Sequence, residues 1–342
     1  MTDIHPYSRL TPDVVLNAIE SLGMRCDGRL LALNSYENRV YQVGLEEASP
    51  VVAKFYRPAR WSDAQILEEH AFARELTEAE VPVVPPLELA GRTLHAFEGF
   101  RFAAYERRGG RAPELDDPQV LEWLGRFIGR IHAVGRARAF VHRPRLDVES
   151  FGEEPREFLL SSGFIPPDLE PAWTQACALA LEGVRAAFER AGDVAYLRTH
   201  GDCHASNVLW TPSTGNDAGG PHFVDLDDSR MAPAVQDFWM LVSGDRHSMA
   251  QQLGHLLRGY EDFSEFDDRE LQLVEALRTL RLVHYCAWLA RRWDDPAFPI
   301  AFPWFNTQRY WQDRVLELRE QVAAMQEPPL APASLHFDAP RH

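Results

Sequence analysis

The sequence lacks several features that would assign its class at once. Its four cysteines lie far apart and form no CxxC pair, so neither a zinc ribbon nor a disulfide framework is indicated. No apolar run approaches 18 residues, so we expect no membrane-spanning helix. The opening MTDIHPYSRL contains no basic stretch followed by an apolar run, so we expect no cleaved secretion signal. These absences predict a cytoplasmic protein.

Positive charge is also scarce. The 342 residues include 35 Lys and Arg against 51 Asp and Glu, a formal net charge of −16. Nucleic acids and anionic membranes bind clustered basic residues, so we predict neither as a partner. The 45% hydrophobic content is that of an ordinary globular protein, and the length favours two domains or lobes. No heptad repeat indicates assembly, so we expect a monomer.

The hydrophobic pattern changes along the chain. It predicts a helix over 12–22, an antiparallel sheet over 30–55, a helix over 63–80 and a hairpin over 91–106. After a glycine-containing connector at 107–110, the remainder is predicted to be mainly helical, apart from a β-like patch at 196–228. The sequence therefore predicts an α+β protein with a small sheet-bearing unit and a larger helical unit, and ligands favour clefts between such units.

The most informative strings are THGDCHASNVLW at 199–210 and FVDLDD at 223–228. Their apolar runs flank a Gly-rich turn at 211–221, which predicts a hairpin that places Asp202, Asn207 and Asp225 on one rim. Carboxylate and amide oxygens of this kind suit Mg²⁺, which keeps several waters and also binds substrate phosphates. The strings therefore favour phosphoryl transfer.

At this point the sequence resembles a known family. The interval from Asp202 to Asn207 matches the protein-kinase catalytic loop, and HGDxHxxN resembles the version in aminoglycoside and choline phosphotransferases. Nearly end to end, the chain resembles the bacterial stress response kinase A family of Ser/Thr protein kinases, through LNSYENRVYQV, KFYRP, ILEEHAF, HGDCH, FVDLDD, QDFWML and RRWDDPAFP. The resemblance implies a bilobal protein-kinase-like fold with an N-lobe at 1–104, a hinge at 105–111 and a C-lobe at 112–342.

The family resemblance also implies roles for the residues of the C-lobe. Asp202 would accept the proton of an attacking hydroxyl or orient that hydroxyl. Asn207 and Asp225 would ligate Mg²⁺ that bridges the phosphates of ATP, which makes Asp225 catalytic as well. Asp237 would hold the catalytic loop by accepting its backbone N–H groups. We expect His200 to be a buried scaffold residue and assign no chemistry to Cys203.

In the N-lobe the resemblance assigns the nucleotide contacts. Lys54 in VVAKFY would grip the α- and β-phosphates. We expect Lys54 to meet Glu69 rather than Glu68, because Glu69 lies on the same inward face of the helix as the apolar residues Phe72 and Leu76. The backbone near Tyr105 and Glu106 would contact adenine.

Several positions depart from the protein-kinase pattern. No GxGxxG precedes Lys54, so we predict that Ser35 and Asn38 in the NSYEN turn donate to phosphate instead. His204 stands where most Ser/Thr kinases have a lysine, and it would either contact the γ-phosphate or support the loop. Asp227 replaces a glycine and would assist the metal or cap the next turn.

The segment after Asp225 is also short. Asp237 follows it by only twelve residues and no Ala-Pro-Glu is present, so we predict an enzyme that is active without phosphorylation of an activation loop. Two further segments invite a functional interpretation. The acidic run at 261–270 could attract a cationic acceptor, although a solvated turn is the simpler interpretation. The aromatic residues between 288 and 311 could line an acceptor site, although packing is simpler.

The leading hypothesis is ATP-dependent, Mg²⁺-assisted phosphorylation of Ser or Thr on a protein, which allows autophosphorylation. The alternative is phosphorylation of a small alcohol such as an aminosugar, choline or homoserine. A third reading takes His200, Asp202 and His204 as the metal ligands of a hydrolase. A fourth hypothesis is a nucleotide-sensing pseudokinase. The presence of Lys54 together with Asp202, Asn207 and Asp225 argues against it.

Overall fold

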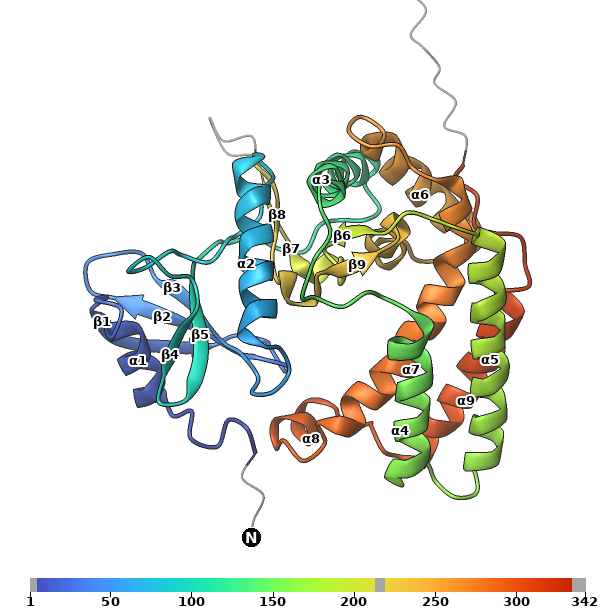
Figure 1. Cartoon of the computed structure of the whole chain (residues 1–342), viewed down its shortest axis with the longest axis horizontal. Coiled ribbons are helices and arrows are strands. Elements are labelled where there is room, and N and C mark those ends of the chain that lie inside the picture. Colours follow the sequence, from blue (N-terminus) through green and yellow to red (C-terminus); the bar gives the residue numbers. More distant parts are fainter. Residues whose placement is uncertain (1–4, 213–218, 334–342) are drawn as a thin grey trace, which may run out of the picture.

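A computed structural model describes residues 5–212 and 219–333. The first part of the chain forms a five-stranded antiparallel sheet with the order β1-β2-β3-β5-β4 (Figure 1). Its strands are β1 (Cys26–Ala32), β2 (Arg39–Leu45), β3 (Val51–Phe55), β4 (His95–Phe97) and β5 (Phe100–Glu106). Two helices accompany the sheet, α1 (Pro12–Glu20) and α2 (Asp63–Glu78). The predicted hairpins and helices of this region are confirmed.

Local sequence explains where these two helices begin. The Thr11 hydroxyl accepts a hydrogen bond from the backbone of Val14, and proline occupies the first turn of α1. Helix α2 begins with a capping box, in which Ser62 and Gln65 satisfy each other's backbone N–H groups. Both caps fix the start of a helix that must dock against the sheet.

The rest of the chain is mainly helical, as predicted. Its α-helices are α3 (Pro118–Arg136), α4 (Glu154–Ser162), α5 (Glu170–Ala191), α6 (Arg246–Tyr260), α7 (Val274–Arg291), α8 (Ala297–Ala301) and α9 (Gln308–Ala324). Two small antiparallel pairs complete it, β6 (Leu197–Thr199) with β9 (Arg230–Ala232) and β7 (Val208–Thr211) with β8 (Gly220–Phe223). The second pair is the predicted hairpin, and residues 213–218 of its turn lie outside the described part of the chain.

Short irregular helices connect these elements. They are the π-turn η1 (Glu149–Glu153) and the 3₁₀ helices η2 (Ala205–Asn207), η3 (Leu226–Asp228), η4 (Ala234–Asp237), η5 (Trp239–Leu241) and η6 (Asp268–Leu273). Two of them, η2 and η3, carry the residues of the site described below.

The hydrophobic cores do not follow the predicted boundary at residue 104. One core joins α1 to the sheet, and another joins α5, α7 and α9. A third combines Phe72, Leu76 and Val83 with Leu124 and Phe223 of the helical part. Val83 also forms an isolated parallel bridge with Phe223. Helix α2 thus lies between the sheet and the helical part and packs on both (Figure 1).

Candidate active site

The loop between β6 and β7 is held by a buried aspartate. The two carboxylate oxygens of Asp237 accept the backbone N–H groups of His200, at 2.7 Å, and Gly201, at 2.8 Å. His132 lies 3.0 Å from the same carboxylate, and all of these groups are buried. His200 points its Nε2 at the carbonyl of Val224, 3.0 Å away. The supporting role of Asp237 and the scaffold role of His200 are therefore confirmed.

Asp202 projects from this loop into a cavity, and it has a cationic partner that the sequence did not indicate. Its Oδ1 accepts a hydrogen bond of 2.6 Å from Nη1 of Arg281 on α7, and its Oδ2 lies 3.4 Å from Nε2 of His204. Burial alone would raise the pKa of Asp202, but His204 and Arg281 lower it below its ordinary value. The carboxylate is therefore ionised at neutral pH, as a group that orients a hydroxyl must be.

Asn207 and Asp225 lie at the end of the loop and at the start of η3. The side-chain amide of Asn207 donates to the backbone carbonyl of Asp202 over 3.0 Å, which fixes the two residues to one another. Asp225 has φ 60° and ψ 60°, a left-handed conformation that is rare for a residue other than glycine and is often stored at functional sites. Its carboxylate is half exposed and lines the same pocket as Asn207. These hard oxygen donors fit Mg²⁺.

Lys54 on β3 reaches this carboxylate from the other side of the cleft. Its ammonium lies 2.8 Å from Asp225 and 3.2 Å from Asp227. Burial alone would lower the pKa of Lys54, but the two aspartates raise it well above its ordinary value. No ion pair joins Lys54 to Glu69 in the described residues, so the predicted pair is wrong in this state, because two carboxylates from the opposite side lie closer.

Glu69 nevertheless lies where α2 was predicted to place it. It is buried, it lines the pocket beside Lys54, and its Oε2 has no hydrogen-bond partner among the described residues. Burial raises its pKa to about 7, against the opposing effect of Lys54. Glu68 points elsewhere, where its carboxylate accepts the backbone N–H groups of residues 141–143. The choice of Glu69 over Glu68 for the pocket is confirmed.

Asp227 is held by residues of the sheet-bearing lobe, and its predicted roles, assisting the metal or capping the next turn, stay predictions. It is buried and pairs with Lys54 and Arg60, and its carboxylate accepts the side-chain amide of Asn38 over 3.2 Å. Burial alone would raise the pKa of Asp227, but Lys54 and Arg60 lower it to about 2. It is a charged link between the two lobes.

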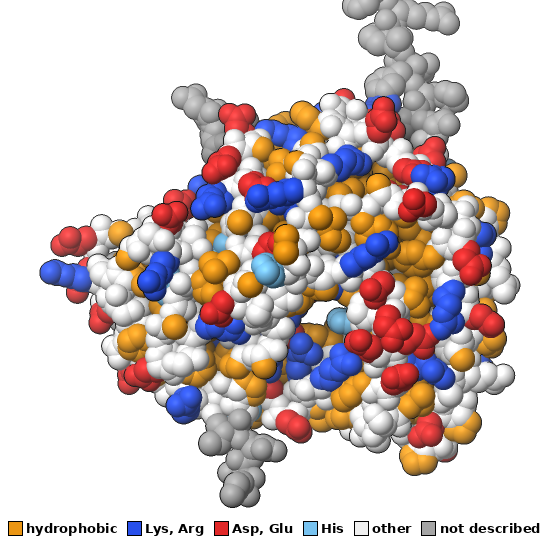
Figure 2. Space-filling model, in the orientation of Figure 1, with side chains coloured by type: hydrophobic (Ala, Val, Ile, Leu, Met, Phe, Trp, Pro, Cys, Tyr) orange, Lys and Arg blue, Asp and Glu red, His pale blue; other side chains and the backbone are white. Residues whose placement is uncertain are grey.

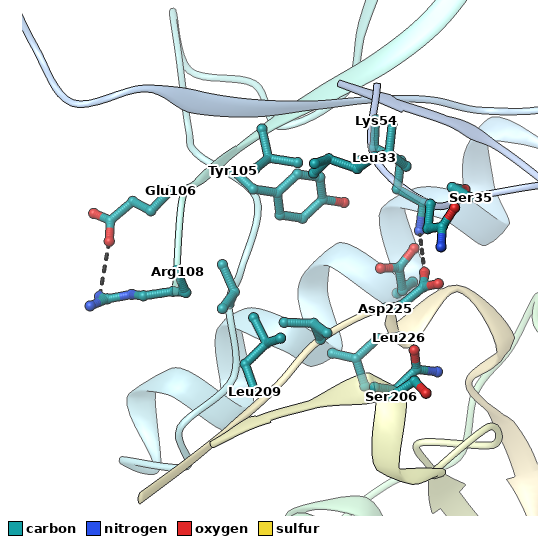
Figure 3. A pocket seen from close by; sticks show the side chains of 17 residues that line it. Leu33, Ser35, Lys54, Tyr105, Glu106, Arg108, Ser206, Leu209, Asp225 and Leu226 are labelled. Carbon is teal, nitrogen blue, oxygen red and sulfur yellow. Dashed lines mark hydrogen bonds and ion pairs between the residues drawn. The ribbon is translucent and has the colours of Figure 1, made fainter. Parts of the chain in front are cut away.

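The pocket beside Lys54 has a cavity volume of about 310 Å³ and two chemically different ends (Figure 3). Apolar side chains line one end, and Lys54, Asp225 and Asn207 line the other. Tyr105 and Glu106, at the end of β5, border the apolar end. The Tyr105 hydroxyl lies 3.0 Å from that of Tyr56, and Glu106 pairs with Arg108 over 3.0 Å. The adenine contact predicted for their backbone stays a prediction.

The turn between β1 and β2 covers the polar end of this pocket. Ser35 lines the pocket and donates its hydroxyl to the carbonyl of Asn38 over 3.1 Å. Asn38 is buried, and both ends of its side chain have protein partners, because Oδ1 accepts the backbone N–H of Arg57 over 3.1 Å. Asn38 does not line this pocket. Asn38 lines the adjoining second cavity and holds the turn to Asp227, and its predicted contact with phosphate stays a prediction.

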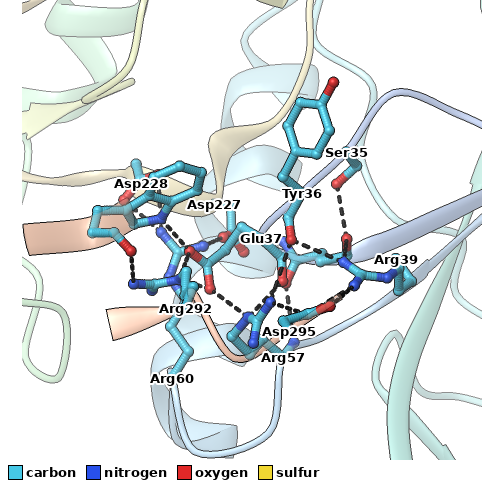
Figure 4. Close-up of polar contacts among 12 residues, drawn as sticks. Ser35, Tyr36, Glu37, Arg39, Arg57, Arg60, Asp227, Asp228, Arg292 and Asp295 are labelled. Carbon is cyan, nitrogen blue, oxygen red and sulfur yellow. Dashed lines mark hydrogen bonds and ion pairs between the residues drawn. The ribbon is translucent and has the colours of Figure 1, made fainter. Parts of the chain in front are cut away.

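A network of buried ion pairs ties this turn to the helical part (Figure 4). Glu37 at the tip pairs with Arg57, at 3.0 Å, and with Arg292 from the end of α7, at 2.7 Å. It also accepts the indole N–H of Trp288. Arg57 continues to Asp295, at 2.8 Å. These contacts could not be predicted from the sequence, because each joins residues that lie far apart in the chain.

A second, larger cavity of about 520 Å³ adjoins the first and contains Asp202. It lies between the two lobes, where the surface is hollowed and charged side chains of both signs gather (Figure 2). Ser35, Asn207 and Asp225 line both cavities, whereas His204 lines only the second. His204 thus shares the second cavity with Asp202, and its predicted contact with the γ-phosphate stays a prediction.

The aromatic residues between 288 and 311 divide between the core of the helical part and the wall of the second cavity. Trp311 and Phe298 are fully buried in the core of the helical part. Trp288 and Phe302 line the second cavity, where Phe302 packs edge-on against Tyr36 of the turn. In the described ranges, no group of three or more His, Cys, Asp and Glu side chains is arranged to hold a metal ion. The same ranges contain no helix that is both long and apolar enough to cross a bilayer.

Comparison with known proteins gives a consistent result. Residues 29–274 match the model of the phosphotransferase enzyme family. The chain is 45% identical over 324 residues to stress response kinase A of Escherichia coli K12, an alignment that covers 95% of this chain and 96% of that protein. It is 44% identical, with the same coverage, to a Salmonella typhimurium protein named a serine/threonine protein kinase.

Solved structures of low sequence identity share the fold. An amicoumacin kinase in complex with AMP-PNP and Ca²⁺ superposes with a TM-score of 0.68 at 19% identity, covering 92% of this chain and 94% of that one. A microcompartment-associated aminopropanol kinase gives a TM-score of 0.67 at 19% identity, covering 91% and 96%. The predicted α+β bilobal fold, a sheet-bearing N-lobe with a helical C-lobe, is confirmed.

Proposed function

The chain belongs to the phosphotransferase enzyme family, among relatives named stress response kinase A, and we propose that it is a serine/threonine protein kinase that uses ATP and Mg²⁺. One observation carries the proposal: the pocket with an apolar end and a polar end that contains Lys54 opens, past Asn207 and Asp225, into the cavity that contains Asp202. A nucleotide whose base lies in the apolar end would present its terminal phosphate to a hydroxyl beside Asp202. We also propose residues 105–111 as the hinge between the lobes.

Each residue of the site has its own role in the proposed reaction. Lys54 holds the phosphates from the sheet side, and Ser35 lies at the turn above them. Asp202 orients the acceptor hydroxyl and takes its proton as the new oxygen–phosphorus bond forms and the bond to the departing ADP oxygen breaks. Asn207 and Asp225 would hold Mg²⁺, which supplies positive charge against the phosphate oxygens. The polar groups are positioned in advance, as electrostatic catalysis requires.

Support for a protein acceptor comes from the relatives. The proteins that are 44 and 45% identical over nearly their whole length include one named a serine/threonine protein kinase. All four cysteines are free, as in a reducing compartment, so we propose that the enzyme acts in the cytoplasm. We also propose that it is a monomer, since no heptad repeat indicates assembly. The small-molecule kinases that share the fold support the second candidate, phosphorylation of a small alcohol.

Transfer of radiolabel from γ-labelled ATP tests the proposal. The purified enzyme is incubated with Mg²⁺ and either bacterial proteins, itself, or a panel of aminosugars, choline and homoserine. We expect labelled phosphoserine or phosphothreonine on protein. An enzyme that labels a small alcohol but neither itself nor any protein would refute the proposal in favour of the second candidate.

Asp202→Asn is the matched variant for this assay. Because the change removes the proton acceptor and leaves the nucleotide pocket intact, we expect transfer to fall by about 10²- to 10⁴-fold. Binding of AMP-PNP, measured by calorimetry, should persist. Undiminished transfer would remove Asp202 from the reaction.

A further inference from the structure

Arg281 lines the cavity that contains Asp202 and contacts Asp202 directly. It comes from the middle of α7, and one guanidinium nitrogen, Nη1, donates to Asp202 over 2.6 Å. Its side chain is 42% exposed. In the part of the chain that the structure describes, its other guanidinium N–H groups donate to no protein acceptor. Arg281 thus offers unsatisfied charged donors directly beside the group that orients the acceptor hydroxyl.

The other arginines of this cavity are already committed. Arg60 pairs with Asp227 and, at 2.8 Å, with Asp228. Arg230 pairs with Asp228 over 2.8 Å. Asp227 and Asp228 are therefore both paired with arginines. Arg281 is paired with Asp202, but it is the most exposed of these three arginines, at 42% against 14% for Arg60 and 8% for Arg230, so its remaining N–H groups are open to an incoming acceptor.

Arg281 also lies where the cavity that contains Asp202 meets a neighbouring hollow. A neighbouring hollow of about 660 Å³ shares His204, Trp239, Arg281 and Tyr285 with the cavity that contains Asp202. The path past Asp202 therefore continues beyond the site of transfer, between α7 and α9. An extended polypeptide with its hydroxyl at Asp202 would pass next to the free edge of the guanidinium.

We propose that Arg281 determines the specificity of the acceptor site: one edge of its guanidinium holds Asp202, and its free N–H groups bind a carboxylate of the acceptor protein beside the Ser or Thr. This inference rests on the proposed protein kinase function. A guanidinium matches a carboxylate with two parallel hydrogen bonds, which gives direction as well as charge. Since consecutive Cα atoms are about 3.8 Å apart, the acidic residue would lie within about two positions of the hydroxyl.

Mapping of phosphorylation sites tests the inference. Phosphatase-treated bacterial proteins are labelled by the wild-type enzyme, by Arg281→Gln and by Arg278→Gln, and the sites are identified by mass spectrometry. Arg278 is the matched control, because it lies one turn earlier on α7, lines only the neighbouring hollow and pairs with Glu275. We expect Asp and Glu to be enriched within two positions of the wild-type sites, lost with Arg281→Gln and retained with Arg278→Gln.

Peptides based on the most strongly labelled site then measure how strongly the enzyme prefers an acidic residue. Wild type should prefer the peptide with Glu over its Gln counterpart by roughly 10- to 100-fold in kcat/KM, chiefly through KM, because a charged hydrogen bond is lost. The preference should fall to about one in Arg281→Gln and be partly restored in Arg281→Lys. AMP-PNP binding and thermal unfolding identify a variant that has merely misfolded.

The outcomes separate the two proposals. Labelled protein sites without acidic enrichment, or an acidic preference that survives Arg281→Gln, would overturn the role of Arg281 and leave the protein kinase function standing. Labelling of a small alcohol with no labelled protein would overturn both.

Discussion

At the scale of single residues, Glu69 makes the stability of the ligand-free protein depend on pH. Burial raises its pKa from an ordinary value of 4.5 to about 7. Between these values the folded protein holds a proton that the unfolded chain has released, so the free energy of unfolding falls as pH rises through this window. The shift of about 2.5 pKa units corresponds to about 3 kcal/mol.

Glu69→Gln should remove this dependence. Urea unfolding at pH 5 and at pH 8 should show the variant gaining about 3 kcal/mol relative to wild type at the higher pH. Glu68→Gln is the neighbouring control, because hydrogen bonds from the backbone lower the pKa of Glu68 despite its partial burial. Its difference from wild type should be nearly the same at pH 5 and pH 8, because both values lie above the pKa of Glu68 in the folded and the unfolded state. An equal difference for Glu69→Gln at pH 5 and pH 8 would contradict the buried, protonated state.

The residue scale also shows where sequence reasoning succeeds and fails. Asp202, Asn207 and Asp225 could be predicted because a short loop and a hairpin fix their spacing. Arg281 could not, since 79 residues separate it from Asp202 and no local pattern marks an arginine on a helix as a partner. The partner of Lys54 was predicted wrongly because several carboxylates from different elements compete for one ammonium, and only their distances decide.

At the scale of elements, the carboxylate of Glu37 is one of the groups that hold the turn between β1 and β2 in place. Glu37 is 12% exposed and contacts Arg57, Arg292 and Trp288. Glu37→Gln keeps the shape but removes the counter-charge of the buried Arg292 guanidinium, while Arg57 keeps its pair with Asp295. We expect the free energy of unfolding to fall by about 2 to 4 kcal/mol and AMP-PNP to bind more weakly, because the turn over the phosphates is released.

Chemical denaturation of Glu37→Gln beside Glu114→Gln measures this effect. Glu114 forms an ion pair with Arg111 in which both side chains are at least 67% exposed. Its loss should cost no more than about 0.5 kcal/mol. If the two variants were equally stable, the network at the turn would contribute no more than an exposed pair does.

At the scale of the whole molecule, the order of sheet and helices along the chain was predictable, but the contacts that pack the two lobes against each other were not. Alternating and helical patterns locate each element, since they reflect local periodicity. They cannot show that the side chains of α2 pack into the C-lobe, because the stripe of Phe72 and Leu76 is compatible with either partner. The contacts between the lobes also depend on charged residues that a sequence pattern would assign to solvent.

These contacts predict that the two lobes unfold together. A core shared by α2 and the helical part, with the ion pairs of Glu37 and Asp295, removes the independent boundary that separate unfolding requires. Scanning calorimetry should therefore show one transition with equal calorimetric and van't Hoff enthalpies. Mg²⁺ with AMP-PNP at one hundred times its Kd should stabilise the folded state by about 2.7 kcal/mol and move the whole transition. Two transitions, of which AMP-PNP shifts only one, would show instead that the shared core does not couple the lobes.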